Sequence, residues 1–198
     1  SRWAIGRWRP GSKISQGEVK RMIVLMGLPG SGKGTQGKML ADELDMHLVS
    51  TGHLVRLYVT GERRQRMLAG ELLDDQEMID MLEKLLATID DNKEIILDGF
   101  PRTVMQAEWL MEQVKKGRYQ LSHVIHLKAS EEVVRERLGL RGRLDDKQEV
   151  IEERFREYQR LTAPVVDWFK THGAPLVEVD AERTTTEIND DLHRLLKI

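Results

Sequence analysis

The sequence predicts an α/β fold, in which a doubly wound, five-stranded parallel sheet is flanked by helices. Short apolar runs alternate with helical patterns from Met22 onward, and this alternation is typical of strands joined by crossover helices. A glycine-rich loop follows the first apolar run and opens a helical stretch. Such folds bind ligands at the carboxyl ends of their strands, so we expect a site beside this loop.

The expected strands are short, and all except the second are rich in Val, Ile or Leu. They are Met22–Met26, His47–Ser50, Glu94–Asp98, His123–Lys128 and Pro175–Val179.

Four of the helices begin with capping signals, in which a short polar residue precedes acidic residues or Gln. These signals are Thr103-x-x-Gln106, Ser130 before an acidic turn, Asp146-x-x-Glu149 and Thr184-x-x-Glu187. Gly37 is unusual in a helix interior, where it marks close packing or weakens the helix.

Two segments do not fit the alternation, namely Gly52–Gln76 and Gly139–Asp146. We expect them to be excursions from the sheet that cover the site, with ordinary connecting loops as the alternative. Residues 22–198 are expected to form one domain. Residues 1–21 are expected to be an extension, either a flexible tail or an artificial remnant. The basic composition of its first 17 residues, which contain no acid, also allows an organellar presequence.

Composition narrows the classes of partner. The 198 residues carry 31 basic and 33 acidic side chains, and a net charge of −2 gives no overall attraction for nucleic acid or an anionic membrane. There is no cysteine, which excludes disulfides and thiolate metal sites and is compatible with a reducing compartment. No apolar run is long enough to span a membrane. Any anion site must therefore be local.

The glycine-rich loop, Gly27–Thr35, has the spacing of a phosphate-binding loop, Gly27-x4-Gly32-Lys33. Glycines allow successive backbone N–H groups to point at a polyphosphate, and the following helix adds its positive N-terminal dipole. Lys33 supplies a cation for the β- and γ-phosphates. Gly34 stands where the general pattern has Ser or Thr, and the hydroxyl follows at Thr35. A plain glycine-rich turn is the alternative, which the strand before and the helix after disfavour.

The third expected strand ends in Asp98, followed by Gly-Phe-Pro and Arg102. An acid at this strand end is placed to hold Mg²⁺, directly or through water, because the metal bridges the β- and γ-phosphates beside it. Arg102 offers two parallel donors to a phosphate. Asp98 is alternatively a turn or cap residue.

A second basic group consists of Arg135, Arg137, Arg141, Arg143 and, further on, Arg154. Arg137 and Arg141 are four residues apart on one helix face, so both can reach one ligand. Such arginines usually form a solvated face, but beside a phosphate loop they indicate a phosphoryl clamp, because transfer depends on positioning and cations.

No His, Asp or Glu stands out as a general base, which a hydroxyl acceptor would require. A phosphate oxygen is already ionised at neutral pH and needs no base. This absence favours a phosphate group as the acceptor.

From Met22 to about Leu196 the sequence resembles the adenylate kinase family of nucleoside monophosphate kinases, which have a fold of the P-loop NTPase type. The resemblance rests on the ordered motifs G-L-P-G-S-G-K-G-T-Q, S-T-G-H-L-V-R, L-D-G-F-P-R-T, R-L-G-L-R-G-R-L-D-D, Arg154 and T-A-P-V-V. It implies transfer of the ATP γ-phosphoryl to AMP, giving two ADP, with Mg²⁺. It also implies a monomer that binds ATP, AMP and ADP. With the charge and composition described above, we expect a cytoplasmic protein without nucleic acid or membrane partners.

The resemblance further implies a role for each matched residue. The catalytic cations would be Lys33, Arg102, Arg137, Arg143 and Arg154. The ATP site would comprise Gly30, Ser31, Gly32, Lys33, Gly34, Thr35, Arg137 and Arg141. The AMP site would comprise Thr51, Arg56, Leu72, Leu73, Gly99, Arg102 and Gln106. Asp98, through water, and Thr35 would hold the metal. Gln106 is alternatively part of a capping box with Thr103.

Three departures from the family pattern stand out. His53 replaces the Asp that usually follows Thr-Gly, which predicts altered local hydrogen bonding. The monophosphate-binding segment, about 51–79, is shorter than usual, and the lid, about 138–146, is cut to a few residues. A short lid excludes water poorly, which predicts more ATP hydrolysis or slower transfer.

Two other functions stay open. The acceptor is alternatively UMP, CMP or dAMP, and Thr51 favours AMP because relatives that prefer pyrimidine monophosphates have S-A-G in place of S-T-G. The shortened segments and His53 also allow a weakly catalytic nucleotide-sensing module.

Overall fold

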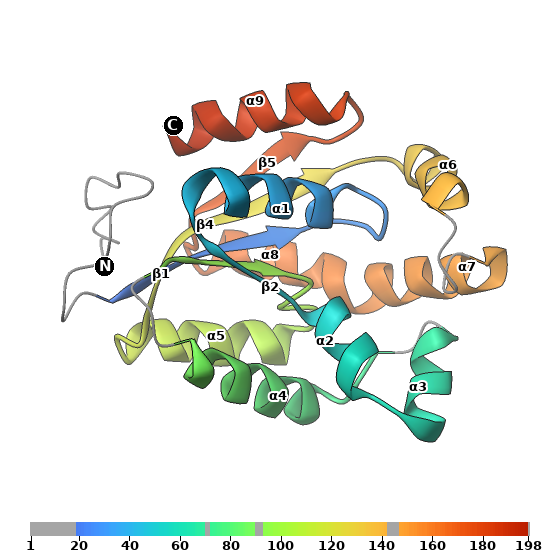
Figure 1. Cartoon of the computed structure of the whole chain (residues 1–198), viewed down its shortest axis with the longest axis horizontal. Coiled ribbons are helices and arrows are strands. Elements are labelled where there is room, and N and C mark those ends of the chain that lie inside the picture. Colours follow the sequence, from blue (N-terminus) through green and yellow to red (C-terminus); the bar gives the residue numbers. More distant parts are fainter. Residues whose placement is uncertain (1–18, 70–71, 90–92, 142–146, 198) are drawn as a thin grey trace.

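The computed structural model describes residues 19–69, 72–89, 93–141 and 147–197. Within them, five parallel strands form one sheet in the order β2-β3-β1-β4-β5. They are β1 (Lys20–Met26), β2 (His47–Ser50), β3 (Ile95–Asp98), β4 (Tyr119–Lys128) and β5 (Leu176–Asp180). Helices cover both faces of the sheet, as Figure 1 shows. The predicted doubly wound α/β fold is confirmed.

All five predicted strands are present, but two begin earlier than the apolar runs predicted. β4 begins at Tyr119 and β1 at Lys20, because these residues pair with each other across the sheet. The register shifts between Met22 and Ile23, where the Ser122 hydroxyl donates to the Met22 carbonyl at 3.0 Å. Backbone pairing does not require apolar side chains, so a polar strand end carries no signal in the hydrophobic pattern.

Alternate residues of the central strand β1 face two different cores. Met22, Val24 and Met26 pack into a cluster with α4 (Asp75–Thr88), α5 (Val104–Lys115) and α8 (Ala163–Thr171). The intervening Ile23 and Leu25 pack on the other face, with α1 (Lys33–Leu44) and α9 (Thr185–Leu196). A continuous apolar run is therefore required in β1, because both faces of the strand are buried.

Gly37 lies where α1 crosses the sheet. A Cβ at this position would lie 3.0 Å from Cδ1 of Leu25 and 3.0 Å from Cδ1 of Leu48. The glycine therefore marks close packing, which is the first of the two alternatives.

A third, smaller core joins the phosphate loop to two helices near its edge. Leu28 packs with buried residues of α6 (Glu131–Arg141) and α7 (Gln148–Glu157), which are Val134, Leu138, Ile151 and Phe155. The chain continues from α7 through a π-helical turn, Tyr158–Thr162, into α8. This core seats the helices that carry Arg137 and Arg154 against the loop.

The capping signals predict three of the four helix starts. The Thr103 hydroxyl accepts from the Gln106 N–H, Thr184 and Glu187 form a complete capping box, and Ser130 precedes α6. Asp146 lies outside the described residues, and α7 begins at Gln148 after Lys147, whose side chain makes no capping hydrogen bond.

The segment after β2 leaves the sheet as two short helices, α2 (Thr51–Tyr58) and α3 (Gly61–Leu68), before α4 returns to it. The expected excursion over Gly52–Gln76 is thus helical in the described residues. Of the expected lid, α6 covers the part up to Arg141, while residues 142–146 lie outside the description.

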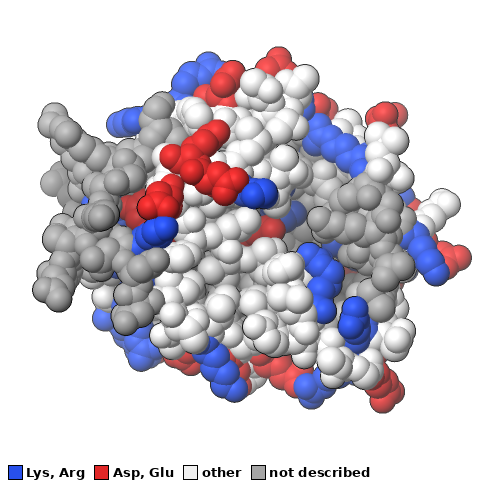
Figure 2. Space-filling view, viewed as in Figure 1, with Lys and Arg blue, Asp and Glu red and all other residues white. Residues whose placement is uncertain are grey.

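No helix among the described residues is both long and apolar enough to cross a membrane. On the face shown in Figure 2, acidic and basic side chains are interspersed around a broad uncharged area. No single sign of charge dominates the part of this face that is described.

Candidate active site

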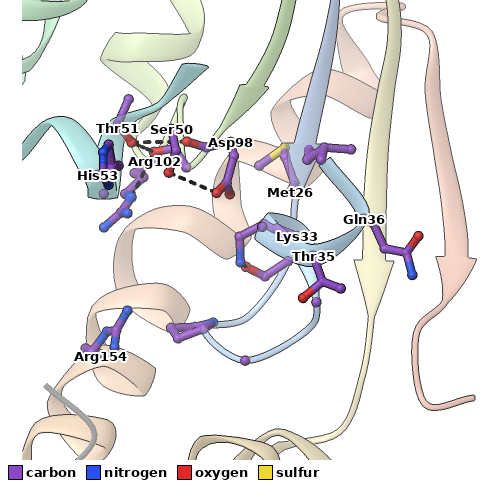
Figure 3. Close-up of a pocket in the computed structure, with 18 of the residues that line it drawn as sticks. Met26, Lys33, Thr35, Gln36, Ser50, Thr51, His53, Asp98, Arg102 and Arg154 are labelled. Carbon is purple, nitrogen blue, oxygen red and sulfur yellow. Dashed lines mark hydrogen bonds between the residues drawn. The ribbon is translucent and has the colours of Figure 1, made fainter. Parts of the chain in front are cut away.

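A cleft of about 1490 Å³ opens at the carboxyl ends of the strands. Met26, Ser50 and Asp98, which end β1, β2 and β3, all line it. Most of the predicted site residues line it too, namely Gly30, Gly32, Lys33, Gly34, Thr35, Thr51, Arg56, Leu72, Leu73, Asp98, Gly99, Arg102, Gln106, Arg137 and Arg154. The single cleft thus collects segments that are far apart in the sequence (Figure 3).

Three predicted site residues stand apart from this set. Ser31 is completely buried and does not line the cleft, so its role in binding ATP stays a prediction. Arg143 lies outside the described residues. Arg141 ends α6, but its side chain also lies outside the description.

The phosphate loop requires glycine for two different reasons. Gly27, Gly30 and Gly32 have positive φ angles of 144°, 89° and 97°, which side chains rarely adopt. Space is also limiting at two of them, because a Cβ would lie 2.5 Å from the Leu127 carbonyl oxygen at Gly27 and 2.9 Å from Leu138 Cγ at Gly30. The loop therefore follows a backbone path that other residues could not hold.

Lys33 closes the loop on itself. Its ammonium donates to the carbonyl oxygens of Gly27 at 2.7 Å and Leu28 at 2.8 Å. The positive charge is thereby held across the start of the loop, where a bound polyphosphate would meet it.

Gln36 connects the phosphate-loop helix to the segment after β5. Its side-chain amide donates to the Thr185 carbonyl at 2.9 Å and accepts from Asn189 at 3.5 Å. Thr184 and Thr185 line the same cleft, so Gln36 fixes one wall of the nucleotide site relative to the loop. The motif contained this residue, but its role depends on contacts that the sequence does not reveal.

Asp98 lies at the meeting point of β3, β2 and α1. Its Oδ2 accepts from the Ser50 hydroxyl at 3.1 Å, and a Cβ at Gly34 would lie only 3.7 Å from the same oxygen. Thr35 lines the cleft from the start of α1. No cluster of three or more acidic, His or Cys ligands occurs among the described residues. One carboxylate with nearby hydroxyls fits Mg²⁺, which keeps several of its waters and binds few protein groups.

The other end of the cleft is built around Gly99. Its carbonyl accepts from the Arg102 Nε at 2.8 Å and from the Thr51 hydroxyl at 2.8 Å. Its φ of 82° is left-handed, and a Cβ there would lie 2.7 Å from the Thr51 Oγ1. Only glycine allows both side chains to approach this turn so closely.

Two guanidinium groups converge at this end. A Cβ at Gly52 would lie 3.5 Å from Nη1 of Arg56 and 3.8 Å from Nη2 of Arg102. The pKa of Arg102 is held below its ordinary value, mainly because burial disfavours the charged form. Asp98 opposes this shift and the charge of Arg56 reinforces it. Like charges held so close together create a site for an anion.

Gln106 is buried and holds Arg102 in place. Its side-chain oxygen accepts from the Arg102 N–H at 2.8 Å, and its Nε2 donates to Asp75 at 2.8 Å. Thr103 donates to the same carboxylate at 2.8 Å. The side chain therefore bonds to Arg102 rather than closing the box at Thr103, and its role in reading a base stays a prediction.

Two arginines of α6, Arg135 and Arg137, have different contacts. Arg135 pairs with Glu131 and Glu152 and lies over the Phe155 ring, so it joins α6 to α7. Arg137 lines the cleft, where its guanidinium donates to the Ala181 carbonyl at 2.6 Å and the Arg183 carbonyl at 3.2 Å. The solvated-face interpretation therefore fails for Arg137, which is held by the turn after β5.

Two further features were not predicted as functional. The Thr162 hydroxyl donates to the Arg102 carbonyl at 3.0 Å, which ties the π-helical turn to the arginine. His53 is exposed and lines the cleft, and its side chain makes no hydrogen bond or ion pair within the described residues.

Comparison with known proteins agrees with this geometry. The family model described as adenylate kinase matches residues 25–174. An adenylate kinase from Corynebacterium urealyticum is 36% identical over 174 residues, covering 85% of this chain and 94% of the relative. Adenylate kinase 1 from a Nostoc species is 36% identical over 180 residues, covering 88% and 97%. An adenylate kinase from Porphyromonas gingivalis is 37% identical over 157 residues, covering 74% of this chain and 81% of the relative. On this match and on the site it contains, the chain belongs to the adenylate kinase family.

Proposed function

We propose that this chain is an ATP:AMP phosphotransferase, which transfers the γ-phosphoryl group of ATP reversibly to AMP and yields two ADP. One observation carries the proposal. The guanidinium groups of Arg56 and Arg102 converge at Gly52, in the same cleft as the phosphate loop. A cleft with two separate anion sites suits a reaction between two phosphorylated substrates.

The proposed reaction joins the two anion sites. An oxygen of the AMP phosphate forms a bond to the γ-phosphorus, and the bond from that phosphorus to the β–γ bridging oxygen breaks, which releases ADP. The attacking oxygen is already ionised, so no proton has to be removed. Lys33, Arg102, Arg137 and Arg154 would balance the charge that spreads over the transferred group, together with Arg143.

The metal belongs to this proposal as well. Asp98, through water, and Thr35 would hold Mg²⁺, which when bound neutralises charge on the β- and γ-phosphates. Thr51 lies beside Gly99 at the acceptor end, and Leu72 and Leu73 would line the AMP pocket. The monophosphate-binding segment at 51–79, the short lid at 138–146, the monomeric state and the cytoplasmic location are further parts of the proposal. Size-exclusion chromatography with light scattering tests the monomer.

An acceptor survey tests the function. ATP and Mg²⁺ are supplied with AMP, dAMP, CMP or UMP in turn, and ADP formation is followed. We expect AMP to give the highest kcat/KM and Arg102→Ala to reduce it by roughly 10²–10³, the size of losing a charge-stabilising donor. Arg156→Ala is the matched control, because Arg156 is exposed, pairs with Glu153 and does not line the cleft.

Two outcomes would contradict the proposal. A higher kcat/KM with CMP or UMP would overturn the assignment of AMP. Nucleotide binding without ADP formation from any acceptor would support the sensing module instead.

A further inference from the structure

Helix α3 carries three arginines, and their side chains serve different purposes. Arg63 forms a surface ion pair with Glu77 of α4 and does not line the cleft. Arg66 also has an interaction partner. Arg64 is exposed, lines the cleft and makes no hydrogen bond or ion pair within the described chain. One guanidinium of the helix is therefore available to a ligand.

The face of α3 that carries Arg64 belongs to the acceptor end. Met67, three residues further along, shares this face and also lines the cleft. Leu72 and Leu73, which follow the helix, line it as well. Figure 1 shows α3 at the outer end of the excursion, beyond α2, which carries Arg56. Arg64 thus stands on the wall of the cleft that the excursion supplies.

The carboxylates of the described cleft lining do not neutralise Arg64. Asp42 pairs with Lys38, and Glu157 pairs with Arg160. Asp98 interacts with Arg102 instead. The acceptor end therefore holds an excess of positive charge, which an anionic ligand would balance. A phosphate monoester carries a charge of roughly −1.5 to −2 at neutral pH and presents three acceptor oxygens, so it can bind more than two guanidinium groups.

We propose that Arg64 is a third phosphate-binding arginine of the acceptor site, which contacts the phosphate of the incoming nucleoside monophosphate from α3. This inference rests on the proposed function. In addition to that function, it assigns a role to Arg64. This arginine of the shortened excursion would strengthen binding of the acceptor and not of ATP.

Steady-state kinetics of Arg64→Ala test the inference. We expect KM for AMP to rise roughly five- to twentyfold, the lower range for a charge-assisted hydrogen bond because the side chain is exposed. KM for ATP and kcat should change less than about twofold, since a contact made equally in ground and transition states affects KM alone. Arg64→Lys, which keeps the charge, should recover part of the loss, and the rise should shrink at high salt.

Arg63→Ala is the matched control. It removes the same charge from the neighbouring residue, whose side chain pairs with Glu77 and does not line the cleft. In Arg63→Ala, KM for AMP should rise much less than in Arg64→Ala. The melting temperature of Arg64→Ala should equal that of the unchanged chain. Calorimetric titration adds a second readout: Arg64→Ala should weaken binding of AMP and leave binding of adenosine unchanged.

Three results would overturn the inference while leaving the proposed function intact. They are an unchanged KM for AMP in Arg64→Ala, an equal rise in Arg63→Ala, and an equal loss of affinity for adenosine and AMP. Failure of the unchanged chain to form ADP from AMP would instead overturn the proposed function, and this inference with it.

Discussion

Single residues at the acceptor end are constrained by the turn at Gly99. Its carbonyl orients Thr51 and Arg102 at once, and its left-handed backbone leaves no room for a side chain. Arg102 is held further by Gln106 at its N–H and by Thr162 at its carbonyl. The arginine is thus fixed at its backbone on both sides and at its Nε, so little conformational entropy is lost when a phosphate binds.

Gly99→Ala should destabilise the fold by about 1–3 kcal/mol, because the methyl group would lie 2.7 Å from Thr51 Oγ1 on a backbone with positive φ. Urea denaturation measures the change. The control is Gly139→Ala in α6, where a Cβ meets nothing within 4 Å, and it should leave stability unchanged or raise it by about 0.5–1 kcal/mol. Equal effects of the two substitutions would refute the steric argument.

Among the elements, the π-helical turn Tyr158–Thr162 connects two parts of the site. It follows α7, which carries Arg154, and its last residue bonds to Arg102. The Tyr158 hydroxyl bonds to Nε2 of His126 on β4 at 3.1 Å, which anchors the start of the turn to the sheet. The turn therefore couples the arginine after β3 to the arginine of α7.

Thr162→Val should lower stability by about 1–3 kcal/mol, because it leaves the Arg102 carbonyl without its donor in a partly buried site. KM for AMP should rise as well, since Arg102 loses one of its supports. Thr171→Val is the control: that hydroxyl is exposed and bonds only within and beside its own helix. The coupling role of the turn is wrong if Thr162→Val lowers stability without changing KM for AMP.

Local signals predicted most of the elements. The strands followed from apolar runs, and the starts of α5 and α9 from Thr103 and Thr184 with their partners three residues on. The early start of β4 was not predictable, because Tyr119 and Gln120 belong to the sheet only through pairing with Lys20 and Arg21. Local patterns do not encode such pairing.

The residues of the site also divide into those predicted from local signals and those placed by contacts between distant parts of the sequence. The phosphate loop is a local motif, so its glycines and Lys33 were found from spacing alone. Gln36 and Thr162 were missed because their partners are 149 and 60 residues away in the sequence. Arg64 was missed because three arginines crowd one short helix, and only the fold decides which of them reaches the cleft.

At the scale of the whole molecule, two histidines of β4, which lies between β1 and β5, make stability depend on pH. Burial lowers the pKa of His123 and His126 below the ordinary 6.5. Lys197 adds to the shift at His123, as Lys128 and Lys170 do at His126, where Glu178 opposes it. The unfolded chain therefore binds protons between pH 6.5 and the lower pKa values of the folded state, so stability falls as pH drops through that window.

We expect the urea midpoint to be lower at pH 5.5 than at pH 7.5. His126→Gln should reduce this difference, because it removes one of the two groups that charge more readily after unfolding. Carboxylates such as Glu178 do not account for this difference. Their pKa in the folded state lies below the ordinary 4.5, so their effect on stability falls below pH 5.5. A pH dependence that is unchanged in His126→Gln would contradict the argument.

Direct transfer between the two phosphate sites of the cleft can be measured by following the γ-phosphoryl group of labelled ATP in the presence of AMP and Mg²⁺. We expect label to enter ADP in step with the loss of AMP, and Arg102→Ala to slow this transfer. Release of the label as inorganic phosphate at the same rate with and without AMP would contradict it.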